Sequence, residues 1–132
     1  MASFMRPFES QVYAVFRIVI GLLFLHHGAQ KLFGFPVPLG AEMSILLYAA
    51  GAIEFFGGLL VMIGLFTTWA AFICSGQMAV AYWMGHGLGL NGPFSIFPLV
   101  NKGELAILYC FAFLFISARG AGIWSVDGTR SS

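Results

Sequence analysis

One carboxylate lies where a charge is costly. Glu54 falls near the middle of an apolar run from Ile45 to Phe66, which is too long and too hydrophobic for the core helix of a soluble protein. A charge at the centre of a membrane-spanning helix costs roughly 2.5–3.5 kcal/mol, so such residues usually face a bundle interior and have a partner or a task. We therefore expect function to centre on Glu54 and its partners.

The candidate partners lie on an earlier apolar segment. At 100° per residue, Arg17, Gly28 and Lys31 fall close to one line along a helix, with His27 just beside it. A rise of 1.5 Å per residue puts His27 closest in height to Glu54, and the long side chain of Arg17 extends toward the same level. We expect Glu54 to pair with His27 or Arg17.

A second pair is expected near the outer mouth of the bundle, where Lys31 and Glu104 fall at similar heights. Carboxylates such as Glu54 and Glu104, together with an imidazole at His27, are the groups that exchange protons in general acid–base chemistry. The sequence therefore predicts a proton-exchanging site with cationic hydrogen-bond donors beside it.

Each of these residues also has a structural interpretation. Arg17 would then only extend its side chain to the inner headgroups, and Glu104 would belong to a helix N-cap with Asn101. A structural ion pair would satisfy Glu54 without any chemistry. His26 points away from Arg17 and is expected on the lipid side.

Composition indicates a membrane protein. Of 132 residues, 60% are hydrophobic and 8% are charged, against about 25% charged in ordinary soluble domains. The net charge of +1 and the lack of a basic patch exclude nucleic acid as a partner. No C-x-x-C or H-x-x-x-H spacing occurs, so we expect no metal site. Cys74 and Cys110 are expected to pack as small apolar residues.

Four apolar segments approach the length of a membrane span, about 20 residues. They predict an all-α integral membrane protein, residues 1–132 forming one domain, with four transmembrane helices in an antiparallel bundle. The expected spans are Val12–Phe33, Ile45–Phe66, Thr67–Met84 and Asn101–Ala118. The first is expected to be a retained span and not a cleaved signal peptide. Lys and Arg near the span ends favour cytoplasmic termini.

Five motifs, in order along the chain, resemble the DoxX family of small four-helix bacterial membrane proteins. They cover about Val15 to Asp127 and read Arg17-x-x-x-Gly21, His27-Gly28-x-x-Lys31, Glu54 with Gly57-Gly58 and Gly64, Asn101-x-Gly103-Glu104, and Gly122-x-Trp124-Ser125-x-Asp127. The resemblance implies membrane redox chemistry with quinones or sulfur compounds, in the bacterial inner membrane. Any enzyme that oxidises the substrate would be a separate, soluble partner chain. It also carries over Trp124 and Asp127 as site residues, beside those already named.

Three functions follow as hypotheses. The first is a quinone-interacting oxidoreductase subunit, in which Glu54, His27 and Glu104 exchange protons. Arg17, Lys31, Gly28, Trp124 and Asp127 would then bind the cofactor. The second is a small proton-coupled transporter, and the third is a membrane anchor or scaffold for soluble redox enzymes. The glycine-rich faces of the first two spans would pack within one chain or between copies of a homo-oligomer.

Overall fold

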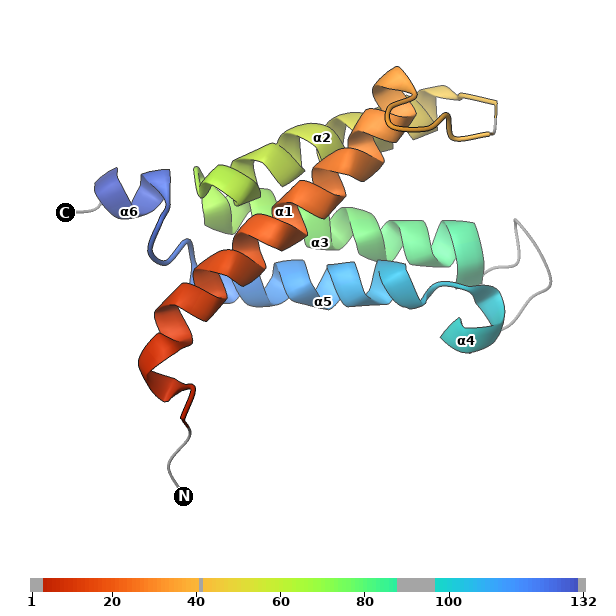
Figure 1. Ribbon diagram of the computed structural model, residues 1–132. Helices are drawn as coiled ribbons and strands as arrows, with labels where there is room; N and C mark the ends of the chain where they lie inside the picture. Colours follow the sequence, from red (N-terminus) through yellow and green to blue (C-terminus); the bar gives the residue numbers. More distant parts are fainter. Residues whose placement is uncertain (1–3, 41, 88–96, 131–132) are drawn as a thin grey trace.

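The computed structural model describes residues 4–40, 42–87 and 97–130, and the elements within them are helices joined by short connections. Four long helices account for most of the chain (Figure 1): α1 (Glu9–Phe33), α2 (Ile45–Ile63), α3 (Thr67–Tyr82) and α5 (Glu104–Arg119). The shorter elements are η1 (Arg6–Phe8), the π-helical turn η2 (Trp83–Gly87), α4 (Pro98–Asn101) and α6 (Val126–Arg130).

Three of the four long helices, α1, α2 and α5, end at a glycine. Gly34 and Gly64 follow α1 and α2 with φ of 68° and 72°, the left-handed conformation that glycine adopts without strain. At the N-terminus of α2 the Ser44 hydroxyl accepts a hydrogen bond from the Leu47 amide at 3.2 Å, an ordinary N-cap. The apolar runs, bounded by glycine and proline, thus predicted the ends of each long helix to within a few residues.

The start of α5 differs from the prediction. Asn101 ends the short helix α4, and Lys102 takes the left-handed conformation with φ of 63°. Gly103 is therefore the N-cap, and the Asn101 Oδ1 accepts its amide at 2.8 Å. Because α5 begins only at Glu104, the expected N-cap at Asn101 is wrong. The apolar residues between the last two expected spans also predict an interfacial connection over residues 85–103, of which residues 88–96 lie outside the described residues.

Two segments are long and apolar enough to cross a membrane, Arg6–Phe33 and Ile45–Ile63. The other two long helices, α3 and α5, have 16 residues each and so extend about 24 Å, less than the roughly 30 Å of a bilayer core. The all-helical fold class is confirmed. Four spans in an antiparallel bundle remain a prediction.

α1 packs along α2, and α3 packs along α5 (Figure 1). The first pair is so close that side chains are excluded from the contact. A Cβ atom at Gly21 would lie 2.6 Å from the Met62 amide nitrogen, and one at Gly58 would lie 2.7 Å from the Gly21 carbonyl. Small residues permit this approach where no hydrophobic drive brings helices together.

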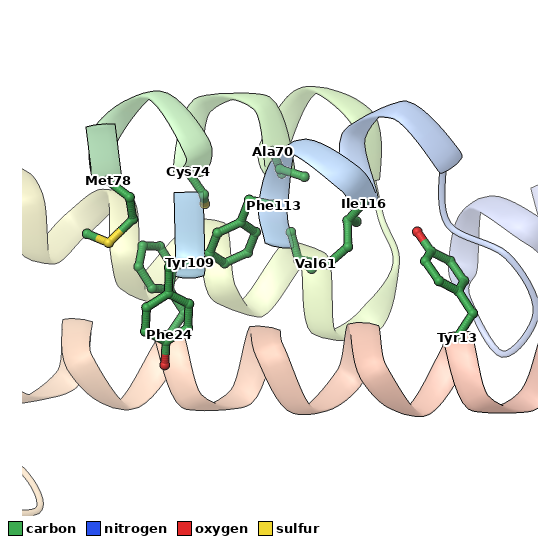
Figure 2. Packing of buried hydrophobic residues seen from close by; sticks show 10 residues of the cluster. Tyr13, Phe24, Val61, Ala70, Cys74, Met78, Tyr109, Phe113 and Ile116 are labelled. Carbon is green, nitrogen blue, oxygen red and sulfur yellow. The ribbon is translucent and has the colours of Figure 1, made fainter. Parts of the chain in front are cut away.

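Aromatic side chains fill the space between α1 and the α3–α5 pair. The Phe24 ring lies 4.6 Å from the Phe113 ring and 5.1 Å from the Tyr109 ring, centroid to centroid. Figure 2 shows these rings between the helices, with Cys74 and Val61 in the same cluster. The core is therefore apolar and rich in aromatic rings, which is the setting in which polar side chains must find partners.

Candidate functional site

Glu54 is buried, and two side chains bind its carboxylate. The Lys31 Nζ lies 2.8 Å from Oε1, and the Gln77 Nε2 donates to Oε2 at 3.0 Å. Glu54 is only 2% exposed and Lys31 is 15% exposed. α1, α2 and α3 each contribute one member, so the site joins three helices. We call Lys31, Glu54 and Gln77 the polar triad.

The expected partners of Glu54 are wrong. Arg17 lies about 21 Å from Lys31 along α1, at 1.5 Å per residue, near the far end of α2. His27 is level with Glu54, but its ring faces α5 and meets the Tyr109 ring edge-on at 5.8 Å. The length of the Lys31 side chain lets the ammonium reach a carboxylate about one turn away, which the comparison of backbone heights left out.

The triad has one unused acceptor. Among the described residues, no group donates to the Gln77 Oε1, although that atom is buried. Reversing the amide would turn the same oxygen toward the Glu54 carboxylate, so the orientation with Nε2 on Glu54 is the favourable one. A buried amide oxygen without a donor costs free energy, and the site is therefore suited to a ligand or water that donates a hydrogen bond.

Arg17 has a different task from the one expected. It is fully buried, and four of its five N–H groups bond to backbone carbonyls. Nε donates to the Val61 carbonyl at 3.1 Å, in the last turn of α2, where a cation complements the helix dipole. Nη1 donates to the carbonyls of Ala121 and Ile123, the latter at 3.0 Å, and Nη2 donates to that of Trp124 at 2.7 Å.

Asp127 completes this arrangement from the other side. Its carboxylate accepts hydrogen bonds from the Phe66 amide at 3.0 Å and from the Thr67 amide and hydroxyl at 2.9 and 2.8 Å, which caps the N-terminus of α3. Partial desolvation raises the pKa of Asp127, but the hydrogen bonds from Thr67 and Phe66 and the charge of Arg130 outweigh it, so its pKa falls below the ordinary value.

Residues 121–127, which we call the C-terminal clasp, therefore fasten the α2–α3 turn to α1. The Ser125 side chain fits against Gly64, leaving no room for a Cβ atom there. The Trp124 side chain is 60% exposed, and its backbone has φ of 57°. Three of the residues expected to form one site with Glu54, namely Arg17, Trp124 and Asp127, lie in this second arrangement instead.

The remaining site predictions divide between the two places. Gly28 packs α1 against the backbone of Phe55, beside the triad. Glu104 is exposed at the first turn of α5, and the predicted Lys31–Glu104 pair is wrong because Lys31 binds Glu54. Gln77 is not among the predicted site residues, although it is the only side-chain amide in α3, which was the available signal. Within the described ranges, no three His, Cys, Asp or Glu side chains gather as metal ligands would.

The comparisons with known proteins agree with the pattern of motifs. The model of the DoxX family matches residues 12–87. A protein of Haemophilus influenzae, described as uncharacterized, is 42% identical over 86% of this chain and 87% of its own length. No solved structure matches the chain significantly.

Proposed function

Because this chain belongs to the DoxX family, we propose that it is an integral protein of the bacterial inner membrane whose four long helices cross the bilayer as an antiparallel bundle. The outward faces of the two shorter helices support this. Trp69 on α3 is 73% exposed, and Leu108 and Phe111 on α5 are 66% and 63% exposed, while Arg17 and Glu54 are buried. A lipid bilayer is the surrounding that favours apolar side chains on the outside of the protein and charged side chains in its interior.

The same proposal places both termini in the cytoplasm. Arg6 belongs to η1, Arg119 ends α5 and Arg130 ends α6, at the end of the helices that carries the termini, whereas Lys102 follows α4 at the other end (Figure 1). This asymmetry follows the excess of positive charge found on cytoplasmic segments. A reporter enzyme active only outside the cytoplasm should be inactive when fused after Arg130, and activity there would reverse the orientation.

We propose that the polar triad is a quinone site of a membrane redox system. The observation that carries the proposal is a buried carboxylate, held by a cation, next to an amide oxygen without a donor. In such a site Lys31 or His27 would donate to a quinone carbonyl, and Gln77 would accept from a hydroxyl of the quinol. Reduction of the quinone takes two electrons and two protons. Glu54 would exchange the protons, and a separate chain oxidising a sulfur compound would supply the electrons.

A binding experiment tests this directly. The protein in lipid nanodiscs is titrated with a short-chain ubiquinone analogue, and quenching of tryptophan fluorescence is followed. Glu54→Gln and His27→Phe should each weaken binding about tenfold, the loss of one buried hydrogen bond to a charged group or donor. Glu42→Gln, a change of the same chemistry at an exposed site, is the control.

Equal quinone affinity in the parent and in both triad-region variants would refute the proposal. His27→Phe retains a ring against Tyr109, so it separates loss of binding from loss of packing. Uptake of a substrate driven by a proton gradient in proteoliposomes, without quinone binding, would favour the transporter instead.

The C-terminal clasp supports a second candidate, a membrane anchor for soluble redox enzymes. Arg17 and Asp127 hold it by hydrogen bonds, and it presents the Trp124 ring to the surroundings. Exposed aromatic side chains are common anchors at protein interfaces. After mild solubilisation, a partner should co-purify with the parent and be lost with Trp124→Ala, and a chain that always purifies alone would exclude a stable scaffold.

A further inference from the structure

An open pocket lies between the start of α1 and the end of α5. Its volume is about 530 Å³, within the usual range for small-molecule sites. The walls are formed by Val12, Tyr13 and Phe16 on α1 and by Phe115 on α5. Val12 and Phe115 are about half exposed, so the pocket opens sideways, toward the surrounding lipid.

The charged groups of this pocket are gathered at its rim. Arg119 Nη2 lies 3.4 Å from Glu9 Oε1, and its guanidinium lies over the Tyr13 ring at 4.6 Å from the centroid. Arg6 lines the same rim, and in the part of the chain that the structure describes no ion pair holds it. Two cations and one carboxylate leave the rim with one positive charge in excess.

The depth of these groups fits a lipid. Arg6 and Glu9 begin the first apolar segment and Arg119 ends α5, so the rim lies at headgroup level. Phe16 lies about 15 Å further along the helix than Arg6, at 1.5 Å per residue, and thus at the level of the acyl chains. An occupant must therefore carry negative charge at one end and hydrocarbon at the other.

We propose that this pocket binds an anionic phospholipid, with the phosphate between Arg6 and Arg119 and an acyl chain along Val12, Phe16 and Phe115. A zwitterionic lipid offers no net charge to the excess cation, so it is the weaker ligand. The site is separate from the polar triad, and the proposal does not depend on quinone chemistry there.

Native mass spectrometry of the full chain tests the site, with phosphatidylglycerol and phosphatidylcholine offered at equal concentration. The parent should retain phosphatidylglycerol preferentially. Arg6→Gln should weaken that binding about fivefold, the effect of one basic residue at a membrane surface. Glu9→Gln should strengthen it, because the carboxylate competes with the phosphate for Arg119.

Arg130→Gln is the matched control, since it removes the same charge from the same end of the protein without touching the pocket. Equal losses in Arg6→Gln and Arg130→Gln would show general surface attraction and overturn the proposal. So would equal retention of the two lipids, or competition by soluble glycerol phosphate as effective as that by the lipid. Displacement of the lipid by the ubiquinone analogue would instead assign the pocket to quinone, and a dimer that forms without lipid would assign it to a second copy.

Discussion

Substitution of Arg17 by lysine gives the sharpest test of the C-terminal clasp. The guanidinium spreads its donors over three nitrogen atoms and so reaches carbonyls of both α2 and the clasp. A lysine keeps the charge, but all its donors are on one nitrogen atom at the end of an unbranched chain. Because the three donors of the ammonium share one nitrogen atom, we expect it to keep two of the four carbonyls, so two hydrogen bonds to a charged group are lost.

A hydrogen bond to a charged group contributes about 1.5 kcal/mol at the lower end of its range. Two of them put the expected destabilisation of Arg17→Lys at about 3 kcal/mol. The free energy of unfolding is measured in mild detergent by titration with dodecyl sulfate, followed by tryptophan fluorescence. Hydrogen exchange at residues 121–127 should rise in the same variant, because the clasp is released before the helices separate.

Arg130→Lys serves as the control, because Arg130 is exposed and a lysine retains its positive charge over the Phe66 ring. A stability change below about 0.5 kcal/mol for Arg17→Lys, the level of ordinary surface substitutions, would refute the reasoning. Unchanged stability with loss of quinone binding would restore the original expectation that Arg17 binds a cofactor.

Three further predictions concern the triad, the helix contact and the α3 cap. Lys31→Met leaves the Glu54 carboxylate buried with only one donor, which should destabilise the protein by about 3 kcal/mol. The double variant Lys31→Met with Glu54→Gln should lose less stability than the two single variants together. Gly28→Ala should destabilise the protein by at least about 2 kcal/mol, because the new Cβ would overlap the α2 backbone. Gly76 faces open space within a helix, so Gly76→Ala should be neutral or stabilising by up to about 1 kcal/mol. Folding lowers the pKa of Asp127, so the stabilisation that its carboxylate provides is present above the unfolded pKa and is lost as pH falls through the folded pKa. Asp127→Asn should therefore make the melting temperature less dependent on pH in the acid range.

Each of these has a clear contrary result. Additive effects in the double variant would mean that Lys31 and Glu54 do not interact. Equal melting temperatures for the two alanine variants would disprove the close α1–α2 contact. An Asp127→Asn variant that keeps the full acid dependence of the parent would place the titrating group elsewhere on the protein.

The helices could be predicted from the sequence because the relevant signals are local. Long apolar runs are separated by glycine and proline, and Gly34 and Gly64 take the backbone conformation that ends a helix. Burial of Glu54 and of the glycine face of α1 also followed from composition and helical phase. The start of α5 was misplaced because the short helix α4 uses Asn101, which the capping pattern had assigned to α5.

The partners of the charges could not be predicted in this way. Height along two separate helices gives no common origin until their register is known, and the Gly21–Gly58 contact sets that register. The position of the C-terminal clasp could not be predicted either. Nothing local in Trp124 or Asp127 indicates that the chain turns back to cap α3 and to receive Arg17, since those bonds join residues 60 and 107 positions apart.

The division of the buried charges into two arrangements bears on function. At Arg17 four of the five donors are taken up by carbonyls of the same chain, and the Asp127 carboxylate accepts three hydrogen bonds from Thr67 and Phe66. Saturated groups fix structure, because a ligand would have to displace a bond already made. The Gln77 Oε1 is in the opposite condition, buried beside Glu54 with no donor among the described residues. A search for substrate, proton or electron chemistry should therefore begin at the triad, and variants of the clasp should be read first as stability variants.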